Sequence, residues 1–215
     1  MLKLKKGARL SSFLFFLTIL SFGGVSYVVL KDFFLSPIEL FEKAQLADYN
    51  KEFKKAEKYY LLSARADDAS ISTLSAYYLG LLYKKSEAKV LQNYQKSKTY
   101  FEKAALEGLP QAQYELALLY DTGDKIRENR IDAIKWMQKA AEQGFVDAEY
   151  AYAVYIDRGY VEGLSSIQAL SYYEKAAMKG HVPAMKGLAL IYKLGAEGIP
   201  PDEEKYHFWM NKVLK

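Results

Sequence analysis

The sequence predicts an all-α repeat protein: an α-solenoid of about five antiparallel helical hairpins, preceded by one transmembrane helix. Three observations predict this fold. Stripes of apolar side chains recur at helical spacing, and residues 10–30 contain no charged side chain. The third is a hexapeptide of pattern Lys-Ala-Ala-x-x-Gly that returns every 36 residues, as KAALEG at 103–108, KAAEQG at 139–144 and KAAMKG at 175–180.

The N-terminal 30 residues have the pattern of a membrane anchor. Residues 10–30 are 21 uncharged residues, about the length that crosses a bilayer. The preceding segment, 1–9, has no acidic residue and contains Lys3, Lys5, Lys6 and Arg9. Because basic flanks stay in the cytoplasm, we expect a single-pass protein of the inner (cell) membrane. Its C-terminal domain, reached through a linker at 31–37, would be periplasmic or extracytoplasmic.

A cleaved signal peptide is the alternative interpretation of this segment. Its apolar region is about 7–15 residues long and ends at small residues, for which Gly24-Val25-Ser26 would serve. The apolar run continues past that point from Tyr27 to Leu30, which favours an uncleaved anchor. Cleavage would instead release a soluble secreted repeat protein. The sequence has no Asn-x-Ser/Thr sequon, which favours a bacterial origin.

Five helices share one pattern of apolar or small side chains. Offsets of 0, 3, 4, 7 and 8 place five side chains on one helix face, as in Ala169, Tyr172, Tyr173, Ala176 and Ala177. The same offsets start at Ala56, Ser97, Ala133 and Tyr206. In each of the last four helices, the residue four positions before the first stripe residue is a good N-cap, namely Asn93, Asn129, Ser165 and Asp202. Glycines then fall where these helices should end, at Gly108, Gly144 and Gly180.

A partner helix precedes each of these five helices. Four partners are predicted at 74–83, 111–120, 147–156 and 183–192. Small residues allow close helix approach and larger residues fill the space between helices, namely Ala112, Ala148 and Ala184, and Leu79, Leu116, Tyr152 and Leu188. A further helix at about 38–48, introduced by Ser36-Pro37, pairs with one at 52–66. Each pair makes one antiparallel hairpin.

Residues 70–215 resemble the Sel-one-like repeat (SLR) family, in a membrane-anchored bacterial form, and residues 38–69 form a divergent tetratricopeptide-like hairpin. The third hairpin matches the family pattern at Ala112, Tyr114, Leu116, Tyr120, Gly123, Ala133, Trp136, Lys139, Ala140, Ala141 and Gly144. The last hairpin matches it at Leu188, Tyr192, Gly195, Gly198, Asp202, Lys205 and Trp209. Departures are Lys125, Tyr152 and Ile156.

The resemblance implies a scaffold or adaptor that binds a peptide or helix of an envelope protein in its concave groove, without naming that partner. By analogy with tetratricopeptide hairpins, the first helix of each pair lines the groove. The groove residues would then be Tyr77, Tyr114, Tyr150 and Lys186, flanked by Leu81, Leu118, Val154 and Leu190. Tyrosine combines contact area with a hydroxyl, which suits binding, but it is also the family's usual residue there and can serve packing alone.

Phe208 is a further candidate binding residue. Polar residues occupy its place in the other four helices, namely Lys58, Thr99, Lys135 and Ser171. An aromatic side chain at this position suggests either a docking point or a cover for the end of the solenoid.

Charge and residue content argue against other functions. The net charge of +4 comes from the four basic residues before residue 10, so the rest is neutral and offers no basic face for nucleic acid. There is no cysteine, and the two histidines, His181 and His207, have no partner at catalytic or metal-ligand spacing. We therefore expect no enzyme activity, cofactor or metal. A hydrolase of unknown substrate is the less favoured alternative, since Ser86 and Lys89 match Ser-x-x-Lys without its companion motifs.

Overall fold

The computed structural model describes residues 35–89, 91–122 and 127–214. In this part of the chain, apart from one 3₁₀ turn at Ser86–Ala88, the regular structure consists of ten α-helices. They are α3 (Pro37–Tyr49), α4 (Phe53–Ser63), α5 (Ala69–Lys84), α6 (Tyr94–Leu106), α7 (Pro110–Thr122), α8 (Arg130–Glu142), α9 (Val146–Asp157), α10 (Ser166–Met178), α11 (Val182–Leu194) and α12 (Glu203–Val213).

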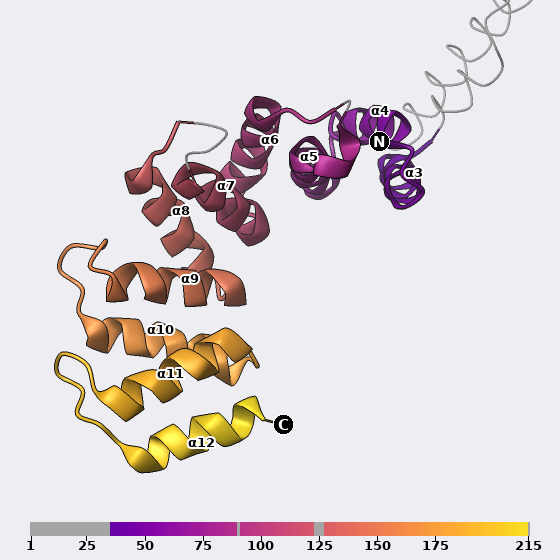
Figure 1. Ribbon diagram of the computed structural model, residues 1–215. Helices are drawn as coiled ribbons and strands as arrows, with labels where there is room; N and C mark the ends of the chain where they lie inside the picture. The colour runs from indigo at the N-terminus through magenta and orange to yellow at the C-terminus, as the bar shows by residue number, and fades with distance from the viewer. Residues whose placement is uncertain (1–34, 90, 123–126, 215) are drawn as a thin grey trace, which may run out of the picture.

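The helices pair as five hairpins, α3–α4, α5–α6, α7–α8, α9–α10 and α11–α12, and each hairpin also packs on the next. This confirms the predicted α-solenoid. Figure 1 shows the hairpins following an arc; over α3–α8, the first helix of each hairpin lies on the inner side of that arc.

The small residues of the hexapeptides lie at the helix contacts. All six alanines are at most 3% exposed, namely Ala104, Ala105, Ala140, Ala141, Ala176 and Ala177. Because alanine has only a methyl group, neighbouring helices approach closely there, and larger side chains of the same stripe fill the remaining space. Phe101, Met137 and Tyr173 are the corresponding buried residues one turn earlier.

Two of the three hexapeptide lysines lie over aromatic rings, whereas Lys103 bonds Ala64 O and Ser72 Oγ. Lys139 Nζ lies 4.3 Å from the centroid of the Trp136 ring, and Lys175 Nζ lies 4.6 Å from that of Tyr172. Each ring belongs to the residue three positions earlier, so the pair forms within one helix and gains a cation–π attraction. The lysine therefore helps to position the aromatic residue of its own stripe.

The helix boundaries follow the predicted capping chemistry. Side-chain oxygens of Asn93, Asn129 and Asp202 accept hydrogen bonds from backbone N–H groups three residues later, at 3.0–3.1 Å. After the second helices, Gly108, Gly144 and Gly180 have φ between +80° and +90°, a conformation that other residues rarely adopt. Asp68 also caps a helix, since its Oδ1 accepts a hydrogen bond from Ile71 N.

Two hairpins contain a polar pair at equivalent positions, each with a buried partner on the first helix and an exposed partner after the second. In α7–α8, Gln143 Nε2 donates to Gln113 Oε1 at 2.8 Å. In α9–α10, 36 residues later, Lys179 Nζ lies 2.6 Å from Glu149 Oε1, and Glu149 is only 2% exposed. One hairpin thus uses a neutral pair where its neighbour uses an ion pair.

The predicted membrane anchor at 10–30 and its flanks lie outside the described residues. Among the helices that the structure does describe, none is both long enough and apolar enough to span a membrane.

Candidate functional site

The predicted groove residues lie on the first helices of successive hairpins. Tyr77 is on α5, Tyr114 on α7 and Tyr150 on α9, and all three side chains are partly exposed. Since first helices lie on the inner side of the arc over α3–α8, at least Tyr77 and Tyr114 belong to inner-side helices (Figure 1).

Each of these tyrosines packs one side of its ring against the solenoid. The ring centroid of Tyr77 is 6.0 Å from that of Phe101, and the ring of Tyr114 is 5.3 Å from that of Phe145. Tyr150 lies between two rings, 5.9 Å from Tyr173 and 4.7 Å from His181. The rings are therefore fixed by the helices around them, as the packing interpretation requires.

The hydroxyls of the same three tyrosines have no hydrogen-bond partner among the described residues, and none is buried. Burial raises the pKa of Tyr77, with a further contribution from Glu115. Burial likewise raises the pKa of Tyr114, with contributions from Asp147 and Glu115. These two hydroxyls thus remain protonated at neutral pH and can donate hydrogen bonds to a ligand. We call Tyr77, Tyr114 and Tyr150 the tyrosine row.

The flanking apolar residues divide into two groups. Leu81, Leu118 and Val154 are partly buried and pack against the hydrophobic cores between hairpins. On α11, Leu190 is 57% exposed and Lys186 is also exposed. The structure thus places three flanking residues mainly in packing and leaves the α11 pair open to solvent.

Phe208 is 53% exposed on α12. Its ring lies 5.0 Å from that of Trp209 and 4.9 Å from Lys212 Nζ, both on the same helix. The equivalent residues Thr99, Lys135 and Ser171 are exposed too, so the position faces solvent in these hairpins. Phe208 therefore stands on the outer surface of α12 rather than over the core of the last hairpin.

The two histidines have structural partners. His181 Nδ1 accepts a hydrogen bond from Ala184 N at 3.2 Å, which caps α11, while its Nε2 lies 3.4 Å from Asp147 Oδ1. His207 Nε2 lies 3.1 Å from Glu203 Oε1 on the exposed surface of α12. Over the described ranges, His, Asp and Glu side chains form no group of three that could hold a metal ion.

A second set of tyrosines, which the sequence analysis did not single out, joins consecutive hairpins. Tyr83 Oη donates to Glu57 Oε1 at 2.5 Å, Tyr120 Oη to Glu102 Oε1 at 2.9 Å, and Tyr192 Oη to Glu174 Oε1 at 3.1 Å. We call Tyr83, Tyr120 and Tyr192 the junction tyrosines. Two of their partners, Glu102 and Glu174, lie 72 residues apart, which is twice the repeat length. This periodicity is the feature of the sequence from which the junction tyrosines could have been predicted.

The junction between α8 and α9 lacks this hydrogen bond. Ile156 occupies the tyrosine position and Gln138 the glutamate position, so both partners are replaced together. Ile156 is 2% exposed, and Gln138 bonds Glu142 on its own helix. Ile156 packs in the hydrophobic core instead, and the adjacent Tyr155 makes a side-chain hydrogen bond with Asp121 of α7.

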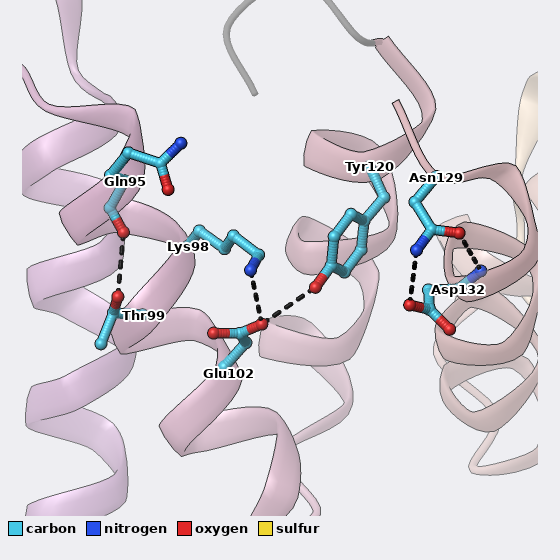
Figure 2. Close-up of polar contacts among 7 residues, drawn as sticks. All are labelled: Gln95, Lys98, Thr99, Glu102, Tyr120, Asn129 and Asp132. Carbon is cyan, nitrogen blue, oxygen red and sulfur yellow. Dashed lines mark hydrogen bonds and ion pairs between the residues drawn. The ribbon is translucent and has the colours of Figure 1, made fainter. Parts of the chain in front are cut away.

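Figure 2 shows the junction between α6 and α7, where Lys98 and Tyr120 both point to the same oxygen of Glu102. Beside it is a hollow of about 510 Å³, lined by Gln95, Lys98, Tyr120, Arg127, Glu128 and Asn129. Most of its polar groups already have partners: Asn129 caps α8 and Glu128 pairs with Arg130. The hollow therefore shows no set of free groups that would select a ligand.

Ionisation of a junction tyrosine is expected to destabilise the folded protein in alkaline solution. Burial, assisted by Glu174, raises the pKa of Tyr192 to about 12. Folding raises the pKa of this tyrosine, so its protonated form stabilises the folded state. That contribution is complete below the pKa of an unfolded tyrosine, about 10, and is lost as the pH rises through the pKa of the folded state. We therefore expect the free energy of unfolding to fall from about pH 10 to about pH 12, and less steeply in Tyr192→Phe.

Urea titrations across this pH range measure the effect. Tyr49→Phe, which removes a hydroxyl from a residue that is 85% exposed, is the control and should follow the wild type. Equal slopes for Tyr192→Phe and the wild type would contradict the assignment.

Comparison with known proteins identifies the class of this fold. The profile of the Sel1 repeat family matches five segments, which together make up more than half of the chain: 46–68, 73–109, 110–145, 146–181 and 182–212. The chain therefore belongs to the Sel1 repeat family, whose members generally mediate protein–protein interactions and are typically not enzymes. No curated protein matches the sequence significantly.

Two of the similar solved structures each match 83% of the chain. One is a Sel1 repeat protein from Oxalobacter formigenes, with a TM-score of 0.69 and 29% identity over 72% of its length. The other is a protective antigen present in uropathogenic Escherichia coli strains, which displays an SLR fold, with a TM-score of 0.73 and 22% identity. This chain spans only 38% of the length of that antigen, and the likeness concerns the fold.

Proposed function

We propose that the protein is a membrane-anchored scaffold that binds a peptide or helix of an envelope protein along the tyrosine row. One observation carries this proposal: the rings of Tyr77, Tyr114 and Tyr150 are fixed by packing, whereas their hydroxyls have no partner within the described chain. A rigid aromatic surface with unused donors loses little entropy when a ligand binds.

The junction tyrosines strengthen this contrast. They lie on first helices as well, yet each hydroxyl is already bonded to a glutamate. The chain thus has two classes of tyrosine, one that holds hairpins together and one whose hydroxyls remain available to a ligand.

The proposed anchor at residues 10–30 would keep this surface beside the inner membrane. Tethering raises the effective concentration of the scaffold toward partners in the same membrane. A groove with low affinity and a small interface can therefore still bind its partner. The absence of charged residues between Arg9 and Lys31 supports the anchor, and the basic residues before it support a periplasmic domain.

The test of binding removes only the hydroxyls. A tagged full-length chain first isolates its partner, whose affinity for Tyr77→Phe/Tyr114→Phe/Tyr150→Phe is then measured. If each hydroxyl contributes one hydrogen bond of about 1 kcal/mol, the affinity falls about 100-fold. Phenylalanine retains the ring packing, so circular dichroism and urea unfolding should stay close to the wild type.

The matched control is Tyr83→Phe/Tyr120→Phe/Tyr192→Phe, which makes the same chemical change at the junction tyrosines. We expect this control to unfold at lower urea concentration and to keep its affinity. Unchanged affinity in the first triple variant, with the partner still bound, would contradict the proposed site.

The topology is tested separately by reporter fusions after residue 215. Alkaline phosphatase should be active and a cytoplasmic reporter inactive. The reverse result would overturn the orientation, and a periplasmic chain of reduced mass that is released from membranes would favour the cleaved, secreted form.

A further inference from the structure

The first helix of the solenoid, α3, exposes three large hydrophobic side chains on one face, with the exposed Glu42 among them. Ile38 is 48% exposed, Leu46 is 61% exposed and Tyr49 is 85% exposed, the largest exposure among the large hydrophobic side chains of the described chain. At roughly 100° per residue these three positions fall within about 80° of the helix circumference. The opposite face already packs in the core through Leu40, Phe41, Ala44 and Ala47.

This face differs from an ordinary end of a repeat array. Terminal repeats usually carry a polar outer surface, because no neighbour covers them. Here a leucine, an isoleucine and a tyrosine flank Glu42 on the exposed face, so we expect it to be covered by an interfacial environment, in which the carboxylate can stay hydrated.

A basic cleft adjoins the C-terminal end of α3. It has a volume of about 540 Å³ and is lined by Lys51, Glu52, Phe53, Lys54, Lys55, Glu87, Ala88, Lys89 and Leu91. Lys51 pairs loosely with Glu87 at 3.6 Å. For Lys54 and Lys89 the described chain provides no ion-pair partner. Four lysines against two glutamates give the cleft a positive balance, which is complementary to an anionic surface.

The position of α3 in the chain connects these features. Only residues 31–36 separate the predicted membrane span from Pro37, and six residues reach at most about 20–22 Å when fully extended. The helix itself has 13 residues and is therefore about 20 Å long. If residues 10–30 cross the bilayer, the whole of α3 is close enough to lie along the membrane surface.

We propose that the outer face of α3 lies in the interface of the bilayer, and that Lys51, Lys54 and Lys89 contact the headgroups of anionic phospholipids. This inference rests on the proposed membrane anchor. Tyrosine favours the interfacial region, where its ring is in an apolar environment and its hydroxyl meets water, and lysines near the surface are attracted to anionic lipid. Such docking would fix the direction in which the solenoid leaves the membrane.

The absence of cysteine from the chain allows a direct test. Leu46→Cys and Phe208→Cys of the full-length protein are labelled with an environment-sensitive fluorophore and reconstituted in phosphatidylcholine vesicles with and without phosphatidylglycerol. Spin-labelled lipid should quench the label at position 46 several-fold more than the label at position 208. Phosphatidylglycerol should increase that quenching, and Lys51→Gln/Lys54→Gln/Lys89→Gln should abolish the increase.

Three results would overturn the proposal in distinguishable ways. Equal, weak quenching at positions 46 and 208, in a chain that resists alkaline carbonate extraction, would leave the anchor standing and exclude lipid docking. Extraction of the chain by carbonate would remove the anchor, and the docking with it. Shielding of the label at 46 in native membranes but not in pure lipid would assign the α3 face to a protein.

Discussion

Replacing Lys179 by alanine is expected to lower the free energy of unfolding by about 1–3 kcal/mol. The reason is Glu149, which is 2% exposed and whose Oε1 lies 2.6 Å from Lys179 Nζ. Its other oxygen, Oε2, is buried and has no hydrogen-bond partner within the described chain. Lys179 also donates to the carbonyl oxygen of Gly144 at 3.0 Å, so the variant loses a second contact between hairpins. Urea unfolding followed by circular dichroism measures the change.

The preceding hairpin supplies the matched control. Glu149→Gln/Lys179→Gln reproduces the amide pair that Gln113 and Gln143 form 36 residues earlier. Because neither partner is then charged, we expect the double variant to unfold within about 1 kcal/mol of the wild type. Equal losses in Lys179→Ala and in the double variant would show that the buried charge is not the cause.

Gly80→Ala is expected to destabilise the protein, although alanine is the better helix former. A Cβ atom at position 80 would lie 2.5 Å from two ring atoms of Phe101, which is fully buried. Overpacking of this kind costs about 1–3 kcal/mol. The gain in helix propensity, up to about 1 kcal/mol, offsets only part of that cost. Thermal and urea unfolding should both report the loss.

Gly187→Ala is the corresponding control on α11. The nearest atom to its new Cβ would be Tyr173 Cε1 at 3.4 Å, an ordinary contact. The propensity gain then dominates, and we expect stabilisation by up to about 1 kcal/mol. The two substitutions are identical in chemistry and should differ in sign; the same sign in both would contradict the packing argument at Phe101.

The hairpins could be predicted from sequence because their determinants are local. Alanines at offsets 7 and 8 of the three middle stripes, an N-cap such as Asn93 and a terminal glycine such as Gly108 act within a few residues of one helix. Their repetition every 36 residues then fixes how many hairpins form. The structure confirms each of these elements in the described part of the chain.

The distinction between the two classes of tyrosine could not be predicted. Tyr114 and Tyr120 lie on the same helix, six residues apart, and both are partly buried. Only the packing of α6 against α7 brings Glu102 to Tyr120 and leaves the Tyr114 hydroxyl without a partner in the described chain. His181 is similar, since its capping of α11 depends on the ring orientation that Tyr150 and Asp147 support.

The replacement of a tyrosine by Ile156 at the junction of α8 and α9 has a mechanical consequence. At the other three junctions a tyrosine–glutamate hydrogen bond joins the second helix of one hairpin to the first helix of the next. Here the adjacent Tyr155 bonds Asp121 instead, so the bond joins two first helices, α7 and α9. The solenoid is therefore expected to hinge about this α7–α9 contact, with α3–α8 and α9–α12 moving as two segments so that the arc can open or close around partners of different width.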